Sequence, residues 1–108
     1  MKKIYVCSRR GRITSYEKYE QLARVYSRMV WDKGYFPITP DLYLPQFLDG
    51  FSKAELKAIA RLKKASMKQC AEVWVFGTLI SKDMQTDIKT AETLNIPVKY
   101  FDQYGEPL

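Results

Sequence analysis

The chain contains no histidine, only two cysteines and no long apolar run. The lack of histidine excludes catalytic triads, zinc sites and general bases that use an imidazole. Cys7 and Cys70 do not have the spacing of a metal-ligand motif, and each lies where an apolar strand is expected to begin or end. We therefore expect two buried free thiols, no metal site and no cofactor.

The apolar runs are too short for insertion into a membrane. No stretch approaches the roughly 20 residues of a membrane-spanning helix. The chain opens on a basic Met1-Lys2-Lys3, but the apolar run that follows is shorter than that of a signal peptide. We therefore expect a cytoplasmic protein.

Length and charge indicate one small domain with an anionic ligand. The 108 residues, 46% hydrophobic and 28% charged, are typical of one globular domain, expected over residues 1–101 and followed by a loose polar tail over 102–108. A net charge of +6 favours phosphates or nucleotides as partners. Because the basic residues are spread along the chain, a nucleic-acid partner is not expected.

The first residues are typical of the opening of a nucleotide-binding α/β unit. Ile4-Tyr5-Val6 predicts a short buried strand, a basic turn follows over residues 8–12, and helical spacing begins near Ser15. Backbone N–H groups and a helix N-terminus can bind a phosphate at such a turn. Two interpretations stay open: an anion site formed by Ser8, Arg9, Arg10 and Gly11, or a solvated basic loop.

The rest of the chain alternates between short apolar segments and amphipathic ones. Further strands are predicted over residues 35–39, 72–77 and 96–101, and helices over about 16–32, 52–69 and 81–95. Pro37 marks the second strand as an edge strand, whereas the strand over 72–77 is apolar on both faces and is expected at the centre. Thr14 or Ser15 is expected to cap the first helix, and Ser52 the second.

Two segments are expected to contribute to the surface of the protein. Residues 40–51 contain prolines and large apolar residues without a regular period, and are expected to form an irregular loop that covers the site or makes a dimer surface. The second helix is expected to bury an apolar stripe: Leu56, Ile59, Ala60 and Met67. Its basic residues are expected on a solvated face: Lys53, Lys57, Arg61, Lys63, Lys64 and Lys68.

This order of elements predicts an α/β fold: a Rossmann-like or flavodoxin-like three-layer sandwich with a four-stranded parallel sheet, order 2-1-3-4, and three helices. Ligands bind such sheets beyond the carboxyl ends of the first and third strands, which would bring residues 8–12 to the segment from Gly77 to Asp83. Asp83 and Asp87 share a helix face, where a carboxylate can act as nucleophile or base. The alternative is that Asp83 caps the helix and Asp87 is an exposed first-turn acid.

Several motifs between Ile4 and Phe101 together point to a family. They are Ile4-Tyr5-Val6-Cys7-Ser8 with Arg10-Gly11, Gly34-Tyr35-Phe36-Pro37-Ile38-Thr39-Pro40, Leu42-Tyr43 with Gln46-Phe47-Leu48-Asp49, Glu72-Val73-Trp74-Val75-Phe76-Gly77, Ile80-Ser81-Lys82-Asp83-Met84 with Asp87-Ile88, and Ile96-Pro97-Val98. With these motifs the chain resembles the nucleoside 2-deoxyribosyltransferase-like superfamily, and most closely its small phage- and bacterium-encoded domains of unknown function.

The resemblance implies a Rossmann-like fold, a nucleoside pocket, and homodimers or higher homo-oligomers. Enzymes of the superfamily cleave or exchange the N-glycosidic bond of 2′-deoxynucleosides or their 5′-monophosphates. By position, Asp87 matches their nucleophilic glutamate and Tyr5 the tyrosine that orients it. Residues 8–12 match the phosphate loop of the monophosphate hydrolases. Lys64 stands where those enzymes have a proton-donating aspartate, and Asp87 is one methylene shorter than glutamate.

The sequence leaves three functions open. The first is a non-catalytic domain that binds a nucleotide or nucleoside. The second is an N-glycosidase or deoxyribosyltransferase with Asp87 as nucleophile. The third is an interaction module that uses the aromatic loop over residues 43–51.

Overall fold

Four parallel strands form one sheet in the order β2-β1-β3-β4. The computed structural model describes residues 1–10, 16–48 and 50–108. The elements in chain order are β1 (Lys3–Cys7), α1 (Tyr16–Asp32), β2 (Phe36–Ile38), α2 (Pro40–Tyr43), the 3-10 helix η1 (Leu44–Gln46), α3 (Lys53–Lys68), β3 (Glu72–Phe76), α4 (Lys82–Thr93) and β4 (Val98–Phe101). The predicted fold class and strand order are therefore confirmed.

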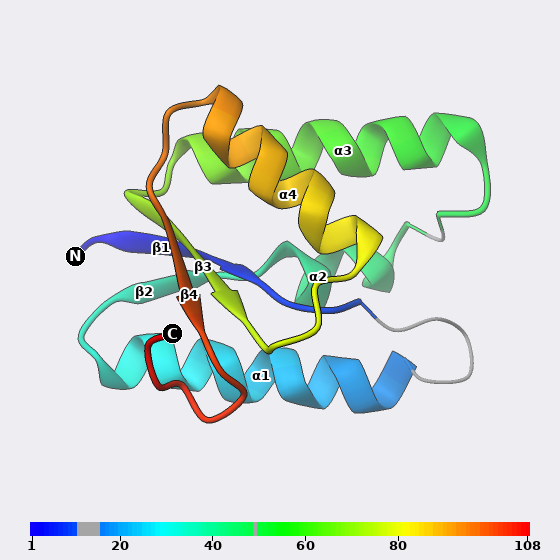
Figure 1. Cartoon of the computed structure of the whole chain (residues 1–108). Helices are drawn as coiled ribbons and strands as arrows, with labels where there is room; N and C mark the ends of the chain where they lie inside the picture. Colours follow the sequence, from blue (N-terminus) through cyan, green and yellow to red (C-terminus); the bar gives the residue numbers. More distant parts are fainter. Residues whose placement is uncertain (11–15, 49) are drawn as a thin grey trace.

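Helices cover both faces of the sheet, with α1 on one face and α3 and α4 on the other (Figure 1). Successive side chains of a strand point to opposite faces. Ile4 and Val6 of β1 accordingly pack in the core beneath α1, whereas Tyr5 and Cys7 pack in the core beneath α3 and α4. This alternation directs the Tyr5 side chain toward α4.

The positions of β2 and β3 in the sheet agree with the residue types of these strands. β2, which contains Pro37, lies at an edge of the sheet as predicted. β3 is central and four of its five residues are buried, also as predicted. Gly34, with φ of +93°, stands two residues after the end of α1 at Asp32, a position typical of a C-terminal glycine. The expected caps Thr14 and Ser15 lie outside the described residues.

The segment over residues 40–51 is more regular than predicted. It contains the short helix α2 and the 3-10 helix η1, so the prediction of three helices misses α2. Pro40 and Pro45 each stand in the first turn of one of these helices, where the fixed φ of proline favours helix and its missing N–H costs nothing. The Tyr43 hydroxyl lies 3.2 Å from the Ser66 hydroxyl, which connects the segment to α3.

Serine side chains cap both long helices on this face. Ser52 accepts a hydrogen bond from the Glu55 N–H at 3.1 Å, as predicted. Ser81 accepts one from the Met84 N–H at 3.3 Å, so the alternative in which Asp83 caps α4 is wrong.

The apolar stripe of α3 is only partly buried. Ile59 and Met67 lie in the core, but Leu56 and Ala60 are exposed. All four residues line a cavity between α3 and α4. Cys7 and Cys70 are buried free thiols, as predicted. Burial raises the pKa of both, that of Cys70 to about 11.

The C-terminal tail is held by backbone hydrogen bonds, in contrast to the expected loose tail. Pro107 forms an antiparallel bridge with Phe101, and the Leu108 N–H donates to the Tyr100 carbonyl at 3.0 Å. A Cβ at Gly105 would lie 2.8 Å from the Met29 sulfur, so glycine allows the tail to pack on α1. The tail thereby covers part of the free edge of β4.

None of the helices among the described residues is both long and apolar enough to cross a membrane.

Candidate functional site

Asp87 is a buried carboxylate on the inner face of α4, with 8% of its surface exposed. It follows Met84 by three residues and precedes Ala91 by four, and both of these are buried against the sheet. Its Oδ2 accepts a hydrogen bond from the Tyr5 hydroxyl at 3.2 Å and lies 3.0 Å from the Lys63 Nζ. The alternative in which Asp87 is an exposed first-turn acid is therefore wrong.

Lys63 points inward from α3 and bridges two carboxylates. Its Nζ lies 3.0 Å from Asp87 Oδ2 and 3.7 Å from Asp41 Oδ1 on α2, and its side chain is 11% exposed. The expectation of a solvated Lys63 was wrong. The signal was present in the spacing, because Lys63 stands four residues after Ile59 and four before Met67, in the middle of the apolar stripe.

The charges of this cluster support one another. Burial lowers the pKa of Lys63, but the neighbouring Asp41 and Asp87 outweigh burial, so the net shift is upward and the lysine is cationic. Burial raises the pKa of Asp87, and Lys63 opposes that shift. The pKa of Tyr5 is raised by burial and then by Asp87 and Asp41, which keeps its hydroxyl protonated as a hydrogen-bond donor.

Both polar contacts of Asp87 use the same oxygen. Among the described residues, Oδ1 has no hydrogen-bond or ion-pair partner, so it is the oxygen that can meet a ligand. Asp87 lines a cavity of about 170 Å³ between α3 and α4, here called the α3/α4 cavity. This volume is roughly ten times the 10–15 Å³ that one buried water needs, so the cavity admits a small organic group.

The polar lining of the α3/α4 cavity has both positively and negatively charged side chains. Its members are Arg10, Lys63, Lys64, Asp83, Thr86, Asp87 and Thr90. Arg10 comes from the turn after β1 and lies close to Gly50, where an added Cβ would stand 3.3 Å from the guanidinium Nη2. Since Gly50 has a φ of +74°, glycine serves both the chain direction and this close approach.

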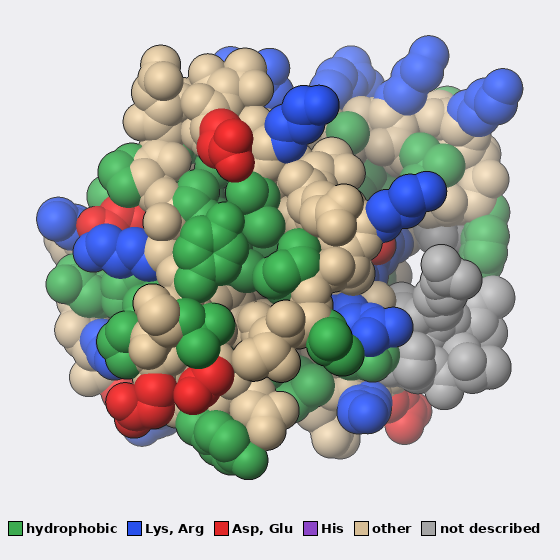
Figure 2. All heavy atoms as spheres, viewed as in Figure 1, with side chains coloured by type: hydrophobic (Ala, Val, Ile, Leu, Met, Phe, Trp, Pro, Cys, Tyr) green, Lys and Arg blue, Asp and Glu red, His purple; other side chains and the backbone are tan. Residues whose placement is uncertain are grey.

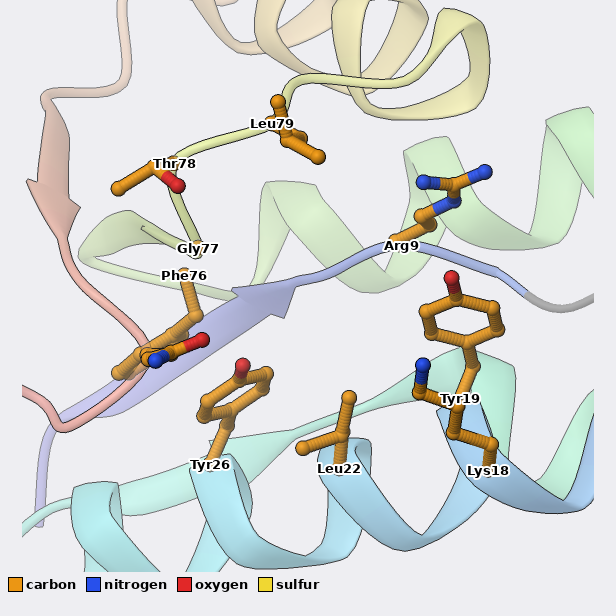
Figure 3. A pocket seen from close by; sticks show the side chains of 10 residues that line it. Arg9, Lys18, Tyr19, Leu22, Tyr26, Phe76, Gly77, Thr78 and Leu79 are labelled. Atoms are coloured by element: carbon orange, nitrogen blue, oxygen red, sulfur yellow. The ribbon is translucent and has the colours of Figure 1, made fainter.

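A second cavity, of about 220 Å³, lies on the α1 side of the same sheet end and is here called the α1 cavity. Figure 3 shows Tyr19, Leu22 and Tyr26 along α1, facing Arg9 and the end of β3. The Arg9 guanidinium carbon lies 5.1 Å from the centre of the Tyr19 ring, a cation–π distance. Gly77 ends β3 with a φ of +99° and donates its N–H to the Phe101 carbonyl at 3.0 Å.

The structure divides the predicted site residues between these two cavities. The α3/α4 cavity is lined by Arg10, Asp83 and Asp87, with Tyr5 hydrogen-bonded to Asp87. Arg9 and Gly77 line the α1 cavity instead. Ser8 is buried, and Gly11 and Arg12 lie outside the described residues. The ligand-binding and catalytic roles of these residues stay predictions.

Lys64, the position matched to a proton donor, lines the α3/α4 cavity but is exposed, and it is Lys63 that contacts Asp87. Within the described parts of the chain, no three His, Cys, Asp or Glu side chains are grouped as metal ligands. The groups present suit an organic anion: guanidinium and ammonium groups pair with phosphate, and a carboxylate accepts from sugar hydroxyls.

A family model described as "Domain of unknown function (DUF7768)" matches residues 2–101. The chain belongs to this family. No curated protein matches the DUF7768 chain.

Solved structures show a similar fold. The DUF7768 chain is similar to the 2-deoxyribosyltransferase of the psychrotolerant bacterium Bacillus psychrosaccharolyticus, with a TM-score of 0.75 and 16% identity over 98% of this chain and 76% of that one. It is also similar to the 2-desoxiribosyltransferase of Leishmania mexicana, with a TM-score of 0.63 and 13% identity over 94% of this chain and 65% of that one. The predicted resemblance to the deoxyribosyltransferase superfamily is thus confirmed at the level of the fold.

Proposed function

We propose that this DUF7768 domain binds a nucleoside or nucleotide in the α3/α4 cavity. The observation that carries the proposal is the Asp87 carboxylate: Tyr5 and Lys63 hold its Oδ2, and its Oδ1 has no partner among the described residues. Oδ1 is suited to accept a hydrogen bond from a sugar hydroxyl, and Arg10 and Lys64 are suited to pair with a 5′-phosphate. The 2-deoxyribosyltransferase-like fold supports a nucleoside ligand.

Three features favour binding without chemistry. The ion pair with Lys63 stabilises the Asp87 carboxylate and so makes it a weaker nucleophile. The raised pKa of Lys63 makes its ammonium a poor proton donor to a departing base. In addition, aspartate is one methylene shorter than glutamate, and a misplacement of about 1 Å can cost on the order of a hundredfold in rate.

A second candidate function is cleavage or exchange of an N-glycosidic bond, favoured by the Tyr5–Asp87 hydrogen bond. Oδ1 would form a bond to the anomeric carbon as the bond from that carbon to the base nitrogen breaks. The base would leave with the electron pair and take a proton from the Lys64 ammonium or from water. Water or a second base would then displace the carboxylate.

The experiment measures affinity and base release on the same samples. Deoxynucleosides and their 5′-monophosphates are tested by calorimetry for binding and by chromatography for free base. Wild type, Asp87→Asn and Asp87→Glu are compared with Asp32→Asn, a control that neutralises an exposed carboxylate at the end of α1. We expect wild type and Asp32→Asn to bind at least one 5′-monophosphate equally, with no base released.

Three other results are informative. Base release by wild type that disappears in Asp87→Asn would establish the second candidate. Release by Asp87→Glu alone would show that only the length of the acid prevents chemistry. If no compound binds and no base appears, both candidates are wrong, and the interaction module over residues 43–51 becomes the working hypothesis.

A further inference from the structure

The positive charge of the chain is concentrated on α3. This helix has six basic residues and one acidic residue in 16 positions, a net charge of +5, compared with +6 for the whole chain. The basic residues look dispersed in the sequence because they alternate with apolar ones. The helix gathers them.

Five of these side chains form one exposed row, here called the α3 ridge: Lys53, Lys57, Arg61, Lys64 and Lys68. Their separations of four, four, three and four residues place them on the same face of the helix. With a rise of 1.5 Å per residue, the row is roughly 22 Å long. Figure 2 shows Lys and Arg side chains projecting along the upper edge, where α3 lies in Figure 1.

The positive charges of the α3 ridge are not paired with carboxylates among the described residues. Within the described residues, none of its five side chains takes part in an ion pair. Like charges four residues apart on a helix repel and destabilise it. A polyanion that lies along the ridge would remove this repulsion and release its own counterions, and counterion release supplies much of the affinity of proteins for nucleic acids.

The ridge is continuous with the α3/α4 cavity. Lys64 belongs to both, and Ala60, which also lines the cavity, lies between the ridge and the buried face of α3. A polymer of nucleotides that follows the ridge therefore passes the mouth of the cavity. A nucleotide in a duplex must leave the base stack before it can enter such a cavity, whereas one in a single strand need not.

We infer that the α3 ridge binds the backbone of a single-stranded nucleic acid. The additional step, in which one nucleotide of this strand occupies the α3/α4 cavity, rests on the proposed function. An anionic membrane fits the surface less well, because an interfacial helix buries a broad face of large apolar side chains beside its charges. On α3, Ile59 and Met67 pack inside the protein. Leu56 and Leu62 are the large apolar side chains of α3 that stay exposed, each by less than half of its surface, which is a small apolar area beside five charges.

The test uses a fluorescein-labelled oligothymidylate of about 20 nucleotides, longer than the usual site of one small domain. Binding is followed by anisotropy at several salt concentrations. The triple variant Lys57→Gln/Arg61→Gln/Lys68→Gln removes ridge charges that do not line the cavity. The control Lys2→Gln/Arg28→Gln/Lys33→Gln removes the same residue types from exposed positions elsewhere.

We expect wild type and control to bind the single strand more tightly than a duplex of equal length. The ridge variant should bind more than about tenfold more weakly, and its dependence of log affinity on log salt should be shallower by about 2, or roughly 0.7 for each lost contact. No binding of the oligonucleotide, equal binding by ridge variant and control, or preference for the duplex would overturn the inference. So would ridge-dependent retention on phosphatidylglycerol vesicles without oligonucleotide binding.

A parallel titration with thymidine 5′-monophosphate separates this inference from the proposed function. If the monophosphate binds equally to wild type and ridge variant while the oligonucleotide fails, the cavity stands and the ridge inference fails. If the oligonucleotide binds through the ridge and no mononucleotide binds, the ridge stands as a nucleic-acid surface and the proposed function fails.

Discussion

The two cavities at the carboxyl end of the sheet differ in what lies at their base. The α1 cavity lies against aromatic side chains, with Tyr26 stacked on Phe76 at 4.7 Å between ring centres. The α3/α4 cavity reaches a charged cluster in which Lys63 bridges Asp41 and Asp87. Both cavities have a cationic rim, from Arg9 in one and Arg10 in the other. A cationic rim therefore does not distinguish the two cavities. What distinguishes them is the buried carboxylate of Asp87, whose Oδ1 has no partner among the described residues.

The largest expected effect tests the charged cluster itself. Lys63→Met would leave Asp87 buried without a counter-charge, and we expect the free energy of unfolding at neutral pH to fall by about 3 kcal/mol. Urea denaturation measures this loss. Lys64→Met, the same change at the exposed neighbour, should alter it by less than about 0.5 kcal/mol.

The loss of unfolding free energy caused by Lys63→Met, here called the deficit, should increase with pH. Burial already raises the pKa of Asp87 above 3.8, and loss of Lys63 raises it further. A carboxyl whose folded pKa exceeds its unfolded value destabilises the fold as pH rises through that range. The deficit should therefore grow as pH rises above 3.8 and shrink on acidification. A deficit that does not change with pH would mean that lost packing, and not lost charge, is the cause.

The next prediction compares the arginines at the rims of the two cavities. Arg10→Ala should weaken binding of a 5′-monophosphate by about tenfold, because it removes a charge-assisted hydrogen bond at the α3/α4 cavity. Arg9→Ala, at the adjacent residue, should leave that affinity nearly unchanged because Arg9 lines the α1 cavity. Calorimetry of both variants with the same ligand measures the difference. The opposite ranking would move the proposed site to the α1 cavity.

The smallest expected effect comes from a comparison of two buried tyrosines, one on each face of the sheet. Tyr5→Phe removes the donor to Asp87 and should lower the free energy of unfolding by about 1 kcal/mol. It should also raise the pKa of Asp87, since the Tyr5 hydrogen bond lowers it, and carboxyl NMR titration follows that shift. Tyr26→Phe keeps the ring stacked on Phe76 and should change neither quantity. Equal effects of the two variants would remove the distinction between the cavities.

Strand order was predictable because it depends on local patterns. The doubly apolar segment over 72–77 and the proline in 35–39 indicate a central and an edge strand, and both were found so. The helix over residues 40–43 was missed because a single turn has too few positions to show a period. The tail was missed because its hydrogen bonds join it to β4, a contact that no pattern within residues 102–108 expresses.

The sequence by itself determined the strands, the three long helices and the parallel sheet of this protein, because periods of 2 and 3.6 residues are encoded in neighbouring positions. Only the tertiary structure decided which side chains meet: Tyr5 from β1, Lys63 from α3 and Asp87 from α4 are distant in the chain and come together through the packing of helices on the sheet. It also placed the adjacent Arg9 and Arg10 at different cavities. The interaction between two charges depends on the distance between them, so which charged side chains pair is known only from the tertiary structure.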